Sequence, residues 1–141
     1  MMVEEAELSA AKKLIDDYLQ LCEDRQIDKA SEFLSIDAEI IFPGNRKYMS
    51  LADMVAASAG RYAWVRKQRD EYSVGESVGS DGHPEQVVTS IGTLYGEGID
   101  GAPFEGIRYI DVFTLRNGQI VRQQVWNDLA ETGIIKISEG K

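Results

Sequence analysis

The segment that decides the fold reads Gly106-Ile107-Arg108-Tyr109-Ile110-Asp111-Val112-Phe113-Thr114-Leu115-Arg116-Asn117-Gly118-Gln119-Ile120-Val121. Up to Leu115 the residues alternate as in a strand with one buried face. Asn117-Gly118 then predicts a tight hairpin turn. Asp111 shares the predicted buried face with Tyr109 and Phe113. Because an ionised carboxylate is costly to bury unless it is paired or neutralised, Asp111 is the leading candidate for a functional residue.

The sequence before this segment predicts three helices and one strand. Apolar residues between Leu8 and Cys22 recur every three or four positions, which predicts an amphipathic helix ending near Asp24. A second short helix is predicted from Asp28 to Leu34, and a strand over residues 38–42. Ser50 and Asp53 resemble the capping box of a third helix. The inward stripe predicted for that helix is Leu51, Met54, Val55, Ser58, Tyr62 and Val65.

After Arg69 the hydrophobic period changes to two, which predicts strands over residues 72–78, 86–97, 106–116 and 119–128. Short turns rich in Gly, Asp, Asn and Pro separate these strands and predict an antiparallel meander. Helices first and strands second indicate an α+β fold, with the helices packed on one face of a curved sheet.

Composition limits the function classes. A chain of 141 residues with 43% hydrophobic content fits one domain. Its net charge of -9 argues against nucleic acid and anionic membranes as partners. The acidic start and the lack of a long apolar run predict a cytoplasmic protein. With one cysteine, Cys22, and one histidine, His83, we predict no intrachain disulfide, metal or other cofactor.

The order of elements resembles the nuclear transport factor 2-like superfamily, which includes SnoaL-like and ketosteroid isomerase-like proteins. The segment from Tyr109 to Val121 is similar to the penultimate hairpin of SnoaL-like domains, and Trp126-Asn127-Asp128 follows it. The resemblance covers residues 1–141 as a single SnoaL-like domain. It implies a cone-shaped, cystatin-like fold with a pocket between the helices and a curved antiparallel sheet. It also implies a homodimer formed through the convex face of the sheet.

Comparison with the isomerase branch implies roles for three positions. Tyr18 matches the active-site tyrosine of those enzymes, and Asp111 matches their protonated aspartic acid. Phe42 occupies the position of the catalytic base and cannot accept a proton, so ketosteroid isomerisation is disfavoured. SnoaL-like cyclases use an acidic residue for acid/base work, and either Asp111 or Asp128 could match it.

These observations predict a protein that binds a small apolar or aromatic ligand. Tyr18 and Asp111 could polarise a ligand carbonyl and stabilise an enolate, which indicates isomerase, cyclase or lyase chemistry without a metal. The predicted catalytic residues are Asp111, Tyr18 and Asp128. The predicted pocket-lining residues are Phe42, Tyr48, Met54, Tyr62, Tyr95 and Trp126.

Alternatives remain open at this point. Asp111 could instead accept hydrogen bonds from Tyr18, Trp126 or backbone amides and serve the core alone. The chain could then be a non-catalytic ligand-binding protein, or a dimerisation module with a filled core. A further branch resembles the small subunit of ring-hydroxylating dioxygenases, which would require a larger partner.

Overall fold

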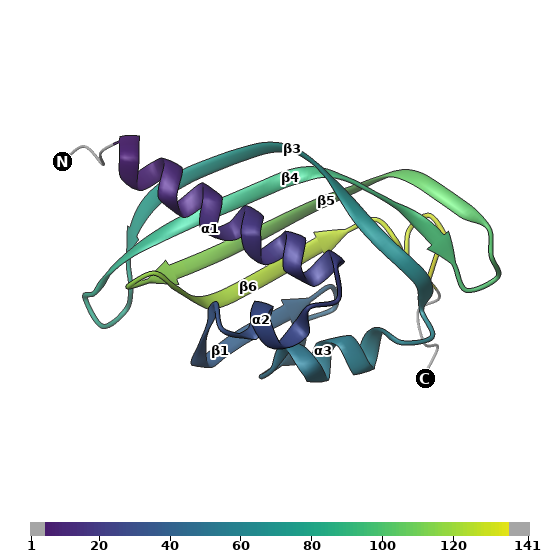
Figure 1. The fold of residues 1–141 in the computed structure, drawn as a ribbon, viewed down its shortest axis with the longest axis horizontal. Helices are drawn as coiled ribbons and strands as arrows, with labels where there is room; N and C mark the ends of the chain where they lie inside the picture. Colours follow the sequence, from purple (N-terminus) through teal and green to yellow (C-terminus); the bar gives the residue numbers. More distant parts are fainter. Residues whose placement is uncertain (1–4, 136–141) are drawn as a thin grey trace.

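A six-stranded sheet with helices on one side makes up the fold (Figure 1). The computed structural model describes residues 5–135. The elements are α1 (Glu5–Glu23), α2 (Ile27–Ser31), β1 (Leu34–Phe42), β2 (Arg46–Tyr48), α3 (Leu51–Ser58), β3 (Tyr62–Val78), β4 (Pro84–Gly98), β5 (Pro103–Arg116) and β6 (Gln119–Asn127). No helix within residues 5–135 combines the length and hydropathy needed to cross a bilayer.

The strand order is β2-β1-β6-β5-β4-β3. The predicted meander of β3, β4, β5 and β6 is confirmed, since each of these strands is antiparallel to the next. Strand β1 joins the far side of β6 in parallel, and β2 pairs antiparallel with β1. The sequence analysis predicted neither of these pairings, because β2 has only three residues and β1 is distant from β6 in the chain.

Two predicted helix ends were wrong, and the strands that follow them begin earlier than predicted. The third helix was expected to reach Val65, but α3 ends at Ser58 and the chain turns at Gly60, whose φ of +87° favours glycine. Tyr62 and Val65 therefore belong to β3, which pairs with β4 over almost its whole length. The second helix was expected to reach Leu34, but α2 ends at Ser31, and β1 already begins at Leu34.

The capping prediction for the third helix is confirmed. Ser50 precedes α3 with extended backbone, and its side chain accepts a hydrogen bond from the backbone N–H of Asp53 at 3.1 Å. This bond satisfies one of the amides that a helix start leaves without an intrahelical partner.

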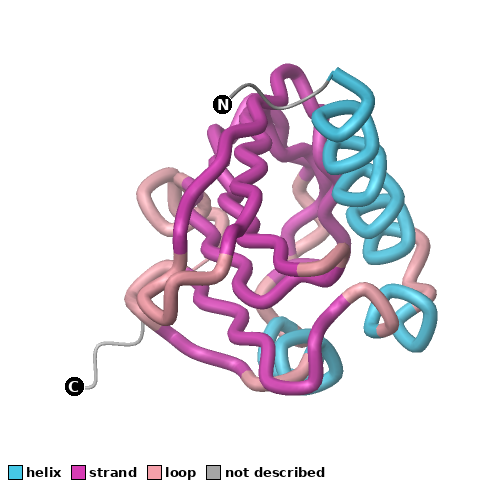
Figure 2. The backbone as a smooth tube through the Cα atoms, turned by 90° about the vertical axis from the view of Figure 1, so that its left-hand side faces the viewer, coloured by secondary structure: helices cyan, strands magenta, loops and turns pink. Residues whose placement is uncertain are grey.

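The sheet curves strongly around the helical side, as the view in Figure 2 shows. Strands β3 and β4 change register between Arg69 and Glu71, opposite Gly92. A Cβ atom on Gly92 would lie only 1.9 Å from the backbone oxygen of Gln68, so the two strands come close only because this position is glycine. Register shifts of this kind bend a strand and help to produce a concave face.

Two hydrophobic clusters fill the concave side. The larger cluster joins α1 to β1, β4, β5 and β6, and its buried members are Ala11, Ile15, Tyr18, Leu19, Ala30, Ile40, Leu51, Val88, Phe113, Leu115 and Ile120. The smaller cluster contains Leu94, Phe104, Ile107, Tyr109 and Leu129. Along β5, Tyr109 belongs to the smaller cluster and Phe113 to the larger one. Asp111 lies between them on the same face, where the apolar core is interrupted.

Candidate functional site

A cavity of about 560 Å³ lies where the two clusters meet. Members of both clusters line it, including Leu19 and Leu51 from the larger and Leu94 from the smaller. Buried polar residues line it as well, namely Tyr18, Asp111 and Gln123. A largely apolar space of this size with a few converging polar groups has the properties of a small-molecule site.

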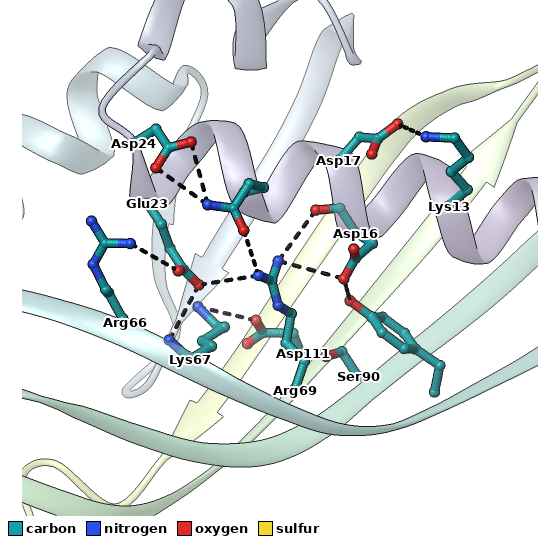
Figure 3. Close-up of polar contacts among 12 residues, drawn as sticks. Lys13, Asp16, Asp17, Glu23, Asp24, Arg66, Lys67, Arg69, Ser90 and Asp111 are labelled. Atoms are coloured by element: carbon teal, nitrogen blue, oxygen red, sulfur yellow. Dashed lines mark hydrogen bonds and ion pairs between the residues drawn. The ribbon is translucent and has the colours of Figure 1, made fainter.

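Asp111 is fully buried at 0% exposure, and its nearest charged neighbour is Lys67 of β3 (Figure 3). The Nζ atom of Lys67 lies 3.5 Å from Oδ2 of Asp111, which makes an ion pair longer than a good charge-assisted hydrogen bond. Among the described residues, neither carboxylate oxygen has a hydrogen-bond partner. Buried polar atoms are normally paired. This carboxylate therefore has free acceptor positions and borders an open cavity.

The two charged groups of this pair influence each other's protonation. Burial raises the pKa of Asp111 above its ordinary 3.8, and the nearby Lys67 ammonium offsets only part of that effect. Burial alone would lower the pKa of Lys67. The Asp111 carboxylate raises it, and the pKa of Lys67 lies above its ordinary 10.5. Asp111 is therefore a stronger base than an aspartate in water, next to a lysine that keeps its proton.

Tyr18 reaches the same cavity but does not bond to Asp111. Its hydroxyl donates to Oε1 of Gln123 at 2.8 Å. Burial raises the pKa of Tyr18 well above its ordinary 10, with a smaller contribution from Asp111. Burial also raises the pKa of the neighbouring Cys22 thiol to about 11. Both side chains therefore keep their protons near neutral pH, and Cys22 is a poor nucleophile.

A polar network on α1 holds the part of β3 that carries Lys67 (Figure 3). The backbone N–H of Lys67 donates to Glu23 at 3.2 Å. Glu23 also pairs with Arg66 at 3.8 Å and with Arg69 at 4.0 Å. Arg69 contacts the backbone oxygen of Asp16 as well, at 3.2 Å. These contacts fix β3 against α1 and so determine where the Lys67 side chain enters the cavity.

The other predicted site residues divide into two groups. Phe42, Met54 and Tyr62 line the cavity. Tyr48, Tyr95, Trp126 and Asp128 do not.

The four residues outside the cavity pack against another ring, lie on the opposite face of the sheet or form an ion pair. The ring of Tyr48 packs edge-on against Phe42, at 5.9 Å between centroids. Tyr95 and Trp126 are 38% and 50% exposed, because strand alternation turns them to the face of the sheet opposite Asp111. Asp128 accepts a hydrogen bond from Arg108 at 2.6 Å, and the Arg108 side chain is 83% exposed.

Sequence reasoning missed Lys67 and Gln123. The sequence pattern predicts a helix that extends to Val65. In the structure Val65 and Lys67 both belong to β3, where residues two apart share a face, so Lys67 points inward with Val65. Gln123 alternates with buried Val125 on β6, a signal that was present in the sequence. Within residues 5–135 no group of three or more His, Cys, Asp or Glu side chains is arranged to hold a metal ion.

Comparisons with known proteins bear on the fold. No protein-family model and no curated protein sequence matches the chain. Solved structures do match. TerC co-crystallised with polyporic acid is 15% identical, with a TM-score of 0.71, and the match covers 89% of this chain and 97% of TerC. An NTF2-like protein of unknown function from Burkholderia pseudomallei is 15% identical, with a TM-score of 0.72 and coverage of 91% and 98%.

A third similar structure is assigned as a SnoaL-like polyketide cyclase from Shewanella putrefaciens. It is 14% identical, with a TM-score of 0.65, and the match covers 86% of this chain and 91% of that protein. At such low identity the likeness concerns the arrangement of the backbone. The predicted α+β fold is confirmed, and the chain has the nuclear transport factor 2-like fold of these structures.

Proposed function

We propose that this protein binds a small, mainly apolar compound bearing a carbonyl group and transfers a proton at the carbon next to that carbonyl. The observation that carries the proposal is the Asp111 carboxylate, which is buried, has no hydrogen-bond partner within residues 5–135 and lines the cavity of about 560 Å³. The raised pKa of Asp111 suits a general base, because proton transfer is most efficient when the base has a pKa closer to the working pH.

The chemical step needs two groups from the chain. Asp111 removes a proton from the α-carbon of the ligand, and the electron pair of that C–H bond forms an enolate. The Lys67 ammonium, which has three N–H donors, stabilises the negative oxygen. If a C=C bond is conjugated with the enolate, the protonated Asp111 returns the proton to the far carbon of that system, which completes an isomerisation. In a cyclisation, the enolate carbon attacks an internal carbonyl, and the alkoxide that forms takes the proton back from Asp111. No metal takes part in this scheme.

The names of structurally similar proteins support a small-molecule role without fixing it. One of them is assigned as a SnoaL-like polyketide cyclase, and TerC was crystallised with polyporic acid. A non-catalytic binding protein is the second candidate, because Gln123 already accepts the hydrogen bond of the Tyr18 hydroxyl that the isomerase-like mechanism would need.

Deuterium exchange distinguishes the two candidates. With 2-tetralone as the probe ketone in heavy water, we expect the protein to accelerate the loss of α-proton signals, measured by nuclear magnetic resonance. If 2-tetralone or polyporic acid raises the melting temperature without any acceleration of exchange, the binding role is correct and the proton-transfer role is not.

We also propose that two copies of the chain pair through the convex face of the sheet. Cross-strand neighbours Ile91, Ile110 and Trp126 form an apolar row on that face, and each is at least 36% exposed. Replacing Trp126 with glutamate would place like charges in a two-fold interface, so we expect Trp126→Glu to be monomeric where the wild type is dimeric. Light scattering after size exclusion measures this. A wild type that is already monomeric at high concentration contradicts the proposal.

A further inference from the structure

Three arginines line the more exposed part of the cavity. Arg25 follows α1, Arg46 begins β2 and Arg61 precedes β3, so three separate segments of the chain supply them. Arg25 is exposed, and Arg46 and Arg61 are half-buried, whereas Tyr18 and Asp111 are fully buried. We call Arg25, Arg46 and Arg61 the arginine rim.

The arginine rim differs from the rest of the arginines in its partners. The other five arginines, Arg66, Arg69, Arg108, Arg116 and Arg122, each lie within 4.0 Å of a carboxylate oxygen. Within residues 5–135 no such ion pair involves a rim arginine. The chain carries 24 acidic residues against 15 lysines and arginines, so carboxylates are abundant. Among the described residues, the three arginines without a carboxylate partner all line the same cavity.

The charges that line the cavity do not neutralise the arginine rim. Besides the rim, the charged lining residues are Lys67, Glu23 and Asp111. Asp111 already pairs with Lys67, and Glu23 pairs with Arg66 and Arg69, which are not lining residues. The outer part of the cavity thus presents uncompensated positive charge in a protein whose net charge is -9. Such a region attracts anions and repels cations.

Arg46 is also held in place. Its Nε–H donates to the backbone oxygen of Pro43 at 3.0 Å, and its Nη1 lies 3.3 Å from the Tyr48 hydroxyl. Its guanidinium lies 5.9 Å from the centre of the Phe42 ring. A guanidinium fixed by such contacts loses less freedom when it binds an anion, and its planar donor pattern suits a carboxylate.

From the arginine rim we infer that the ligand of the cavity carries a carboxylate. In this arrangement the carboxylate binds the rim, the apolar part lies among Leu51, Met54 and Leu94, and the carbonyl reaches Asp111 and Lys67. A cavity of about 560 Å³ matches a compound of drug-like size, such as an aromatic or polycyclic acid. The inference rests on the proposed binding site, and it adds the charge of the ligand, which the proposed proton transfer does not require.

Two probes of the same shape test the charge preference. We expect 2-naphthylacetic acid to bind about 10-fold more tightly than neutral 2-naphthylacetamide at low ionic strength, as measured by titration calorimetry. We expect this ratio to fall as salt is added, because the rim is partly exposed and salt screens it. Equal affinities, tighter binding of the amide, or no binding of either probe would overturn the inference.

Rim variants locate the effect. The double substitution Arg46→Gln and Arg61→Gln should bring the affinity for the acid down to that for the amide while leaving amide binding within about 2-fold. Arg122→Gln is the matched control, because Arg122 lies outside the cavity at 4.0 Å from Glu39, and it should keep the preference for the acid. An unchanged preference in the double variant contradicts the inference.

The inference and the proposed function can fail separately. If the acid is preferred through the rim but 2-tetralone undergoes no accelerated exchange, the ligand class stands and proton transfer does not. If exchange is accelerated but acid and amide bind alike, proton transfer stands and the carboxylate inference is wrong. Asp111→Asn should retain the preference for the acid, because it does not alter the rim.

Discussion

Asp111→Asn is expected to lower the rate of α-proton exchange in 2-tetralone by about 10²–10⁴-fold, the usual contribution of a general base. The amide of asparagine has nearly the shape of the carboxyl group but cannot accept the proton. The fold should persist, because the Lys67 ammonium that loses its partner belongs to a side chain that is 23% exposed and that water can reach. Nuclear magnetic resonance measures the exchange rate, and circular dichroism checks the fold.

Asp128→Asn is the matched control. Asp128 was the second acid predicted from the sequence, but it pairs with exposed Arg108 and does not line the cavity. Its removal should leave the exchange rate within about 2-fold of the wild type, since an exposed ion pair contributes little. If Asp128→Asn loses as much activity as Asp111→Asn, or Asp111→Asn keeps most of it, the assignment of the base is wrong.

Lys67→Met is expected to destabilise the folded protein by about 2 kcal/mol near neutral pH. Removing one member of a fully buried ion pair costs roughly 3–5 kcal/mol, because the remaining charge has no partner. We expect less here, because the Lys67 side chain keeps 23% exposure and the remaining Asp111 can bind a proton. Urea denaturation monitored by tryptophan fluorescence gives the free energy of unfolding.

The destabilisation should depend on pH with a definite sign. Without Lys67, the pKa of folded Asp111 rises further above its unfolded value, because burial is no longer offset. A raised folded pKa favours folding below the unfolded pKa, and this advantage is lost as pH rises through the folded pKa. Lys67→Met should therefore lose less stability in mild acid than at neutral pH. Adding Asp111→Asn should restore part of the loss at neutral pH, and a loss independent of pH in Lys67→Met would contradict this account.

The sequence predicted the fold well where local signals were strong. The alternation around Asp111, the turn at Asn117-Gly118 and the cap at Ser50 all depend on neighbouring residues, and each corresponds to the observed element. The parallel pairing of β1 with β6 joins segments about 80 residues apart, and no local pattern specifies such a contact. The end of α3 was misplaced even though Gly60 marked it.

The candidate site was only partly predictable for the same reason. The burial of Asp111 followed from its place on an apolar strand face, and Tyr18 lies on the inner face of α1 as expected. Lys67 was not predicted, because the sequence pattern indicates a helix that extends to Val65. The three rim arginines come from three separate segments of the chain, and their convergence on one cavity depends on tertiary structure.

The central claim is that Asp111 is a buried acid with a raised pKa that a ligand can reach. Carbon-13 nuclear magnetic resonance of labelled aspartate, assigned by comparison with Asp111→Asn, measures it most directly. We predict that Asp111 titrates above its ordinary 3.8 and that adding 2-tetralone shifts its carboxyl resonance. A pKa at or below the ordinary value, with a resonance that no added ketone perturbs, would contradict the account.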